Sequence, residues 1–380
     1  MLNKGIKLKK YDIVVFGATG FTGELICDYL LSHEESKKLN IAVAARDKEK
    51  LEKVASRFSP NDPDMLVVDS FDKESIDSMT SLAKLIITVV GPYSLYGEYL
   101  VESCTKNSTH YVDLTGEPNF VHTIRKKYSE AATSSKSIIV NSCGLESIIP
   151  DVGTLYTVSK MKSDKKDITY YLKSRGTISG GTWASFINAL YSNKPIIGGG
   201  SKSGSSKKIK KIFYNKDFKS WSVIFPVIDK QIVYRSSKTD SIYGNNFSFN
   251  EYMMIKTFFQ VIALILSILS ITFISKLGLF KKWLLSLRPS GSGPSIEQRK
   301  RNWFKGVFVG IGNNEKVVTQ LSGGDPGYGE TAKFISEIAL CIINDYDNLK
   351  SKAGIMTPVE CTGDLMINRL KNAGIKFEQF

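Results

Sequence analysis

A glycine-rich turn near the start of the chain is the feature with the clearest chemistry. The segment GATGFTG consists of Gly17, Ala18, Thr19, Gly20, Phe21, Thr22 and Gly23, and it directly follows Tyr11–Phe16, a run typical of a buried strand. Glycine has no Cβ, so a pyrophosphate can approach the main chain, and the helix that follows offers N–H groups and its positive dipole end. The spacing is GxxGxxG rather than the more familiar GxGxxG, and an ordinary turn is the alternative. The pattern predicts a dinucleotide-binding loop.

The end of the second predicted strand indicates which dinucleotide is bound. Ile41–Ala45 is followed by Arg46, where an NAD site usually carries an acid that bonds the ribose 2′-OH. A guanidinium cannot accept that bond but can pair with a 2′-phosphate. Asp47 is adjacent, and its residue type fits the N-cap of the next helix. We therefore expect NADP, with NAD as the alternative cofactor and an ordinary surface position as the alternative for Arg46.

Polar and aromatic residues after the third, fourth and fifth strands complete the predicted site. Hydride transfer by a nicotinamide cofactor requires a proton from a tyrosine, an acid or a water molecule. Each candidate also has a structural alternative, such as helix capping by an acid in a first turn. The candidates for cofactor contact are Asp69, Gly91 and Pro92, and the candidates for catalysis are Tyr93, Tyr96, Asp113 and Glu117.

Alternating strand and helix patterns predict a doubly wound sheet that positions these residues. Continuous apolar strands separated by helices are what a parallel sheet covered on both faces requires. The predicted strands are Tyr11–Phe16, Ile41–Ala45, Met65–Asp69, Leu85–Val90, Thr109–Asp113 and Ser137–Asn141. We expect an α/β protein with an NAD(P)-binding Rossmann domain at 1–150. A second mixed α/β substrate domain is expected at 151–251 and 303–380, with a hydrophobic segment and its basic flank at 252–302.

Composition and missing motifs exclude several other classes of protein. Hydrophobic residues make up 42% of the 380 residues and charged residues 23%, which is ordinary for a folded soluble domain. Five cysteines lie far apart and only three histidines occur, so neither a disulfide scaffold nor a metal site is expected. No HExxH, GxSxG or P-loop motif is present. The net charge of +14 comes without any recognisable nucleic-acid module, so no nucleic-acid partner is expected.

An uncharged stretch, Thr257–Ser275, indicates contact with a lipid surface. As a helix it would be about 28 Å long, close to the roughly 30 Å core of a bilayer. A single crossing would place 303–380 across the bilayer from the Rossmann domain, so we favour a monotopic insertion over a span or a buried core helix. The basic residues that follow Lys276 would then lie on anionic head groups. The first ten residues lack the apolar stretch of a secretory signal, so we expect a lipid droplet or the cytosolic face of a membrane rather than secretion.

Several sequence blocks together carry a resemblance to a known family. They are VVFGATGFTGE, AARDKEKL, VVGPYSLYGE, YVDLTGEPNF, CGLESIIPDVG, SGGTW, GDPGYGETA and GIMTPVE, and they extend over nearly the whole chain. The chain resembles the saccharopine dehydrogenase-like oxidoreductases, which are related to trans-acting enoyl reductases of lipid biosynthesis. The resemblance implies an N-terminal Rossmann domain, association with lipid droplets or membranes, and a part in lipid or glycolipid synthesis. It does not imply saccharopine dehydrogenase activity, because no arginine in these blocks can be assigned to a dicarboxylic amino acid.

The sequence therefore leaves two functional hypotheses. The first is an NADP-dependent, enoyl-reductase-like oxidoreductase that acts on a lipid or lipid-like substrate at a membrane or lipid-droplet surface. The alternative is a nucleotide-binding protein that associates with lipid as a scaffold or sensor. The sequence does not indicate an oligomeric state.

Overall fold

A computed structural model describes residues 9–176, 183, 187, 210–224, 228–276, 280–288 and 293–380. The chain divides into two units, each with its own sheet. Unit 1 comprises Met1–Gly144 and Thr331–Met366, and unit 2 comprises Leu145–Glu330 and Ile367–Phe380.

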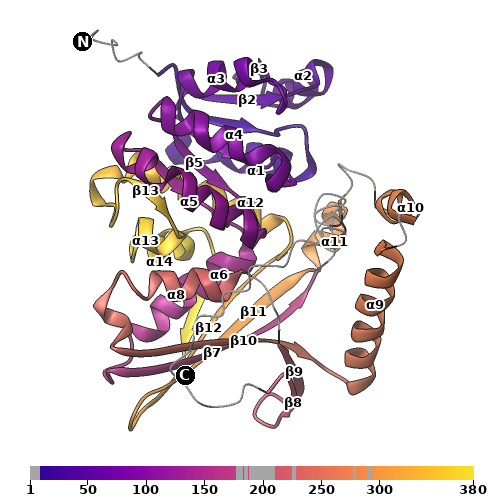
Figure 1. The fold of residues 1–380 in the computed structure, drawn as a ribbon, viewed down its shortest axis with the longest axis vertical. Helices are drawn as coiled ribbons and strands as arrows, with labels where there is room; N and C mark the ends of the chain where they lie inside the picture. Colours follow the sequence, from indigo (N-terminus) through magenta and orange to yellow (C-terminus); the bar gives the residue numbers. More distant parts are fainter. Residues whose placement is uncertain are drawn as a thin grey trace. The chain divides into compact units, whose positions relative to one another are not determined.

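Unit 1 is built on a parallel sheet. Within the described residues this sheet is seven-stranded, in the order β13-β6-β5-β4-β1-β2-β3 (Figure 1). All neighbouring strands pair in parallel, as the doubly wound prediction requires. The strands are β1 (Tyr11–Phe16), β2 (Ile41–Ala45), β3 (Asp64–Val67), β4 (Ala83–Thr88), β5 (His110–Asp113), β6 (Ile138–Val140) and β13 (Gly354–Met356).

The helices of unit 1 follow its strands, and capping residues close in the sequence set where several of them begin. Asp47 accepts a hydrogen bond from the Lys50 N–H at 3.1 Å, and this cap starts the second helix. Thr357 and Glu360 form a reciprocal capping box at the start of the short helix after β13. The helices are α1 (Phe21–Ser32), α2 (Lys48–Ala55), α3 (Lys73–Leu82), α4 (Tyr93–Lys106), α5 (Pro118–Ser134), α12 (Gly329–Asn344) and α13 (Pro358–Thr362).

The division of the chain differs from the expected domain bounds. The expected boundary at 150 lies inside α6 (Leu145–Val158), and the expected second domain at 303–380 contains β13, which pairs with β6 of the first sheet. Residues 331–366 therefore belong to unit 1. The sequence could not indicate this, because a three-residue apolar strand carries no information about which distant strand it will pair with.

Unit 2 contains a mixed sheet, as the prediction of a second α/β domain requires. The described strands form a seven-stranded sheet in the order β14-β12-β11-β7-β10-β9-β8. β7 and β10 pair in parallel, and the other pairs are antiparallel. The strands are β7 (Lys165–Arg175), β8 (Ile212–Asn215), β9 (Ser220–Ile224), β10 (Asn246–Ile255), β11 (Trp303–Ile311), β12 (Lys316–Gly323) and β14 (Lys376–Gln379).

One face of this second sheet carries packed helices. Helix α6 packs on β11 and β12, and α8 (Asp229–Ser236) packs on β10 (Figure 1). Gly153 of α6 allows the close approach, since a Cβ there would lie 2.2 Å from Cζ of Phe308. The remaining helices of the described chain in this region are α9 (Phe258–Lys276), α10 (Lys281–Ser286), α11 (Ile296–Lys300) and α14 (Leu365–Asn372).

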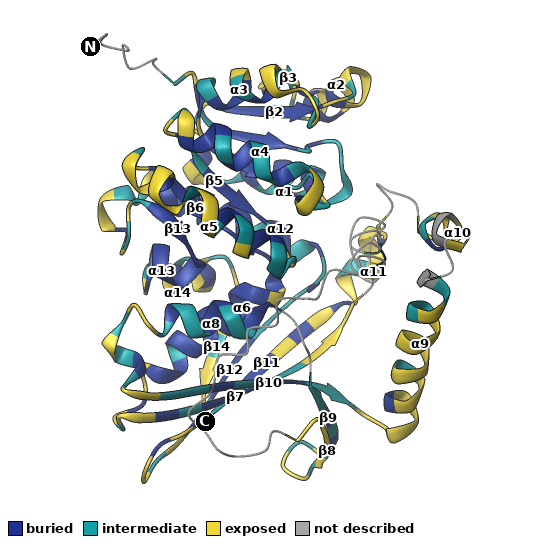
Figure 2. Ribbon diagram, viewed as in Figure 1, coloured by how far each residue is buried: buried dark blue, intermediate teal, exposed yellow. Residues whose placement is uncertain are grey.

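Helix α9 contains most of the uncharged stretch identified in the sequence. Its apolar side chains lie largely in the open, with Phe259 83% and Phe273 69% exposed, and Figure 2 shows most of the helix as exposed or half-buried. None of the helices in the described ranges combines the length and the apolar character that a membrane crossing requires.

We predict that Gly153→Ala destabilises unit 2. The added methyl group would meet Phe308, whose ring is stacked on Tyr170 with centroids 4.7 Å apart and cannot easily move. Overpacking of this kind costs about 1–3 kcal/mol, and urea denaturation should show that loss. Gly116→Ala is the matched control, because a Cβ at Gly116 would meet nothing within 4 Å. Equal stability of the two variants would contradict the packing argument.

Candidate functional site

The residues predicted to bind the cofactor follow the carboxyl ends of parallel strands. Such ends meet at one edge of a sheet, where open α/β proteins bind their ligands. In unit 1 this edge collects Gly17, Arg46, Asp69 and Gly91, which follow β1 to β4, and Asp113, the last residue of β5. The structure therefore brings the predicted cofactor residues to a common edge.

The glycine turn at this edge is shaped by two glycines with different roles. Gly17 has a φ of +93°, a conformation that side-chain-bearing residues rarely adopt. A Cβ at Gly23 would lie 2.1 Å from the Gly17 carbonyl oxygen, so only glycine lets α1 sit so close to the turn. Gly20 is the N-cap of α1 and donates its N–H to the Gly17 oxygen at 3.0 Å. The N-terminus of α1 is thereby held at the end of β1, where its first N–H groups can face an anion.

Arg46 provides a positive charge beside this turn. It directly follows β2 and is exposed, while Ala44 of the same strand accepts the N–H groups of Gly17 and Ala18 at 2.8 and 3.2 Å. The side chain of Asp47 is occupied as the cap of α2. The acid next to Arg46 therefore has a local structural role, and the guanidinium remains the group suited to a 2′-phosphate.

The other predicted cofactor residues lie in turns at the same edge. Asp69 accepts the N–H of Phe71 at 3.0 Å in a turn after β3. Phe71 packs edge to face with Tyr96 of α4, with ring centroids 5.1 Å apart. Gly91 is exposed and Pro92 is the N-cap of α4.

Tyr93 and Glu117 act together as a structural pair. Glu117 accepts the N–H groups of Tyr93 and Ser94 at 2.7 and 3.1 Å, which caps the N-terminus of α4. The hydroxyl of Tyr93 is buried, donates to the Thr88 carbonyl at 3.3 Å and accepts the N–H of Leu114 at 3.2 Å. Burial also raises the pKa of Tyr93. Both side chains hold loops in place rather than facing an open site.

Asp113 fastens the loops after β5 and β6. It is fully buried, and it accepts hydrogen bonds from the main-chain N–H groups of Thr115 and Ser142 and from the side chains of Tyr111 and Asn141, all between 2.7 and 3.0 Å. Burial raises the pKa of Asp113 to about 6, although the two N–H groups act in the opposite direction. Its contacts make it a positioning residue for the edge of the sheet.

The residues of this edge fit a bound NADP. The turn leaves main chain accessible at Gly20, where a Cβ would meet only the Gly17 oxygen at 3.3 Å, and Arg46 carries the charge that a 2′-phosphate needs. When bound, the cofactor would supply a hydride at its nicotinamide ring.

Comparison with known proteins shows what the chain is similar to. Residues 13–140 match the family model of the saccharopine dehydrogenase NADP binding domain. The chain is 27% identical to a saccharopine dehydrogenase-like oxidoreductase of Rattus norvegicus, with 97% of each chain covered. It is 28% identical to a lipid droplet localized protein of Caenorhabditis elegans, with 98% of each covered.

The chain is similar over nearly its whole length to saccharopine dehydrogenase-like oxidoreductases. Residues 13–140 form its NADP-binding domain, which confirms the predicted cofactor. It is also 27% identical, over 97% of each chain, to a Mycobacterium tuberculosis protein that carries the name of a trans-acting enoyl reductase. Among solved structures, the apo saccharopine dehydrogenase (L-Glu forming) of Saccharomyces cerevisiae has a TM-score of 0.58 at 13% identity, covering 97% of this chain and 100% of that one, and this likeness shows the fold alone.

A group of acidic residues in unit 2 was not identified from the sequence. Asp229 of α8 and Glu251 of β10 are both buried, and Ser147 donates to Asp229 at 3.0 Å. Burial raises the pKa of Glu251 to about 8, while the ammonium of Lys230 acts in the opposite direction. Burial also raises the pKa of Asp229, and the carboxylate of Glu251 adds to the effect. The sequence signal that could have found it is Glu251, an acid at the start of the otherwise apolar end of β10.

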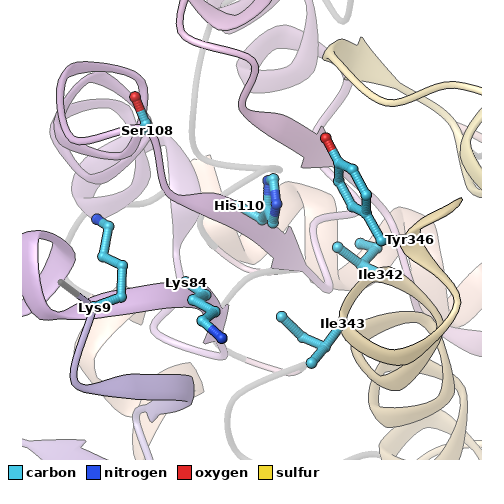
Figure 3. A pocket seen from close by; sticks show the side chains of 7 residues that line it. All are labelled: Lys9, Lys84, Ser108, His110, Ile342, Ile343 and Tyr346. Carbon is cyan, nitrogen blue, oxygen red and sulfur yellow. The ribbon is translucent and has the colours of Figure 1, made fainter. Parts of the chain in front are cut away.

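A small pocket in unit 1 lies away from the predicted cofactor edge. Figure 3 shows Lys9, Lys84 and His110 at its wall. These residues lie near the amino ends of β1, β4 and β5, and the pocket has a volume of about 220 Å³. Lys9 donates to the carbonyls of Thr80 and Asn107 and to the Thr109 hydroxyl, and burial lowers its pKa to about 8. His110 accepts the N–H of Ile138 at 3.0 Å, and burial lowers its pKa to about 4. These groups already serve the fold.

We predict that Arg46→Asp reverses the cofactor preference. The variant loses the cation that pairs with the 2′-phosphate and gains an acceptor for a ribose hydroxyl. NADPH affinity should fall roughly 10- to 100-fold relative to NADH, as measured by fluorescence titration. Lys53→Asp, a charge reversal at an exposed position of α2, should leave the ratio unchanged. Equal affinity of the parent protein for both nucleotides would rule out this role for Arg46.

We also predict a pH-dependent stabilisation by Glu251→Gln. The pKa of Glu251 is about 8 in the folded protein against an ordinary 4.5, so the folded state binds more protons and stability falls as the pH rises from about 4.5 to 8. Glutamine cannot ionise, so the Tm difference should shift in favour of the variant between pH 5 and pH 9. Glu315→Gln is the control, because backbone N–H groups lower the pKa of Glu315 and its effect is confined to acid. Parallel melting curves for Glu251→Gln and the parent would show that Glu251 is ionised throughout this range.

Proposed function

We propose that this protein is an NADP-dependent reductase that acts on a lipid-like substrate at a membrane or lipid-droplet surface. The observation that carries the oxidoreductase part is the close fit of Gly17 and Gly23, which holds the start of α1 at the carboxyl edge beside Arg46. The full-length similarity to saccharopine dehydrogenase-like oxidoreductases supports the same conclusion. The relative named for trans-acting enoyl reduction favours a carbon–carbon double bond of a lipid as the reducible group, with a part in lipid or glycolipid synthesis.

The exposed surface of α9 supports the lipid part of the proposal. Besides Phe259 and Phe273, the side chains of Leu266 and Leu269 are 57% and 59% exposed. Contiguous apolar surface of this kind is costly in water, at about 25 cal/mol per Å², and marks an interaction site. The relative that is localized to lipid droplets is consistent with this interaction.

The pairing of strands on either side of α9 favours a monotopic attachment. β10 precedes α9 and β11 follows it, and both strands are hydrogen-bonded to β7 in one sheet. If α9 crossed a bilayer once, β10 and β11 would lie on opposite sides of it, although both strands pair with β7. We therefore propose that both ends of α9 return to the same side of the lipid surface, where its basic flank meets anionic head groups.

Reduction of an enoyl group needs a proton in addition to the hydride. Tyr93, Asp113 and Glu117 are occupied by contacts that hold loops. The ring of Tyr96 packs against Phe71, and within the described part of the chain its hydroxyl makes no hydrogen bond. Tyr96 is thus the candidate of the four that keeps its proton available, with a water molecule as the other source.

The alternative function is a nucleotide-binding scaffold or sensor at lipid surfaces. The specific observation in its favour is the structural use of Tyr93, Asp113 and Glu117. This protein would bind NADPH as a structural or signalling ligand without turnover.

Turnover distinguishes the two functions. Purified full-length protein, NADPH and lipids with and without an enoyl group should show oxidation of NADPH at 340 nm only with the reducible lipids. Gly23→Ala should abolish both binding and oxidation, because its Cβ would lie 2.1 Å from the Gly17 oxygen, and Gly116→Ala should retain both. Firm NADPH binding without oxidation across a broad lipid panel would support the scaffold instead.

A further inference from the structure

Three strands at one end of the unit 2 sheet share an apolar face. In the antiparallel register, Ile212 lies opposite Val223 and Tyr214 opposite Trp221, and these two residues of β9 lie opposite Met253 and Ile255 of β10. Directly opposed residues point to the same side of a sheet. We call this set the hairpin face; it consists of Ile212, Tyr214, Trp221, Val223, Met253 and Ile255.

The hairpin face is open, whereas the opposite face is occupied. Ile212 is 40% and Tyr214 48% exposed, and the other four residues are half-buried. On the opposite side, Ser222 of β9 and Tyr252 of β10 are only 0% and 7% exposed. The strands thus bury one side and leave a second, apolar side partly exposed, which a sheet of a soluble domain normally avoids.

Lysines flank β8 in the sequence, just before the strand and in the turn that follows it. Lys210, Lys211, Lys216 and Lys219 are all exposed and are accompanied in the hairpin by a single acid, Asp217. Apolar and aromatic side chains on a hairpin that also carries exposed lysines match the interface of an anionic phospholipid surface.

The hairpin face is continuous with α9. Trp221 of β9 packs against Phe258 at the start of α9, with ring centroids 4.7 Å apart. Helix α9 contacts both β9 and β10. The exposed apolar helix and the hairpin face therefore form adjoining parts of one surface within unit 2.

We propose that the β8–β9 hairpin docks on an anionic phospholipid surface as a second contact next to α9. The inference rests on the proposed lipid attachment of α9 and adds to it a separate element with its own charge. The aromatic and aliphatic side chains of the hairpin face enter the interfacial layer, and the lysines lie on the head groups. Two contacts fix the orientation of unit 2 on the surface, which one helix alone would not do.

Flotation of the full-length protein with vesicles tests the docking. The vesicles are phosphatidylcholine alone and phosphatidylcholine with about one third phosphatidylserine. Ile212→Ser with Tyr214→Ser should lower the partition coefficient roughly 10-fold on both vesicles, because two exposed apolar side chains are removed. Lys211→Glu with Lys219→Glu should lower it at least about 10-fold on the anionic vesicles and little on the neutral ones.

A matched control exists on the other sheet. Met65 and Val67 of the edge strand β3 are 43% and 55% exposed with the same spacing. Met65→Ser with Val67→Ser should leave partition unchanged, and thermal melts of all variants should show an intact fold.

The outcomes separate the hairpin from α9. If Phe259→Ser with Phe273→Ser abolishes flotation while both hairpin variants bind as the parent does, the hairpin inference is overturned and the α9 attachment stands. If the α9 variant floats normally, the proposed attachment itself fails. If the hairpin variants float as the parent does but differ from the parent in mass in sedimentation, the hairpin binds a second copy of this chain. That result also overturns the inference.

Discussion

The closeness of α1 to the turn that precedes it is the constraint on which the cofactor site depends. Only a hydrogen atom fits between the Gly23 Cα and the Gly17 carbonyl, because a Cβ would come within 2.1 Å of that oxygen. The helix therefore starts directly at the end of β1, and its dipole and unpaired N–H groups are held at the carboxyl edge of the sheet. Without this contact the helix would move outward and the anion site would lose its donors.

The acids of the same edge have a supporting role that their residue types did not reveal. Asp113 joins the loops after β5 and β6 through four hydrogen bonds, and Glu117 caps α4. Fixed N–H donors stabilise these carboxylates at all times, whereas a substrate would do so only while it is bound. This matters because a buried acceptor without a hydrogen-bond partner is costly. Loops fixed in this way also suit hydride transfer, because its rate depends on how the reacting groups are positioned.

The second unit combines two features in one sheet. β10 and β11 are held together through their shared partner β7, while α9 lies between them in the chain with its apolar side chains largely exposed. Asp229 of α8 and Glu251 of β10 remain protonated more readily than ordinary carboxyls because burial disfavours their charge. The strand that leads into the exposed helix α9 thus also carries a buried acid.

The sequence by itself determined the cofactor turn, the helix signals and the strands of the first sheet up to β6. These features depend on local causes: glycines that tolerate positive φ, an Asp47 cap and continuous apolar runs. The strand bounds differ by up to two residues, as for β4, which begins at Ala83 rather than Leu85. The lipid contact of Thr257–Ser275 stays a prediction that the exposed α9 supports.

Only the tertiary structure decided that β13 joins the first sheet, that Tyr93 holds a loop in place and that acids are buried in unit 2. Each depends on partners far apart in the chain: β13 on β6, Tyr93 on the N–H of Leu114, and Asp229 on Ser147. A short strand or a single polar side chain has many equivalent partners in a sequence, and the choice among them is made by packing and by the cost of burying an unpaired polar group. That choice becomes visible only when the chain is folded.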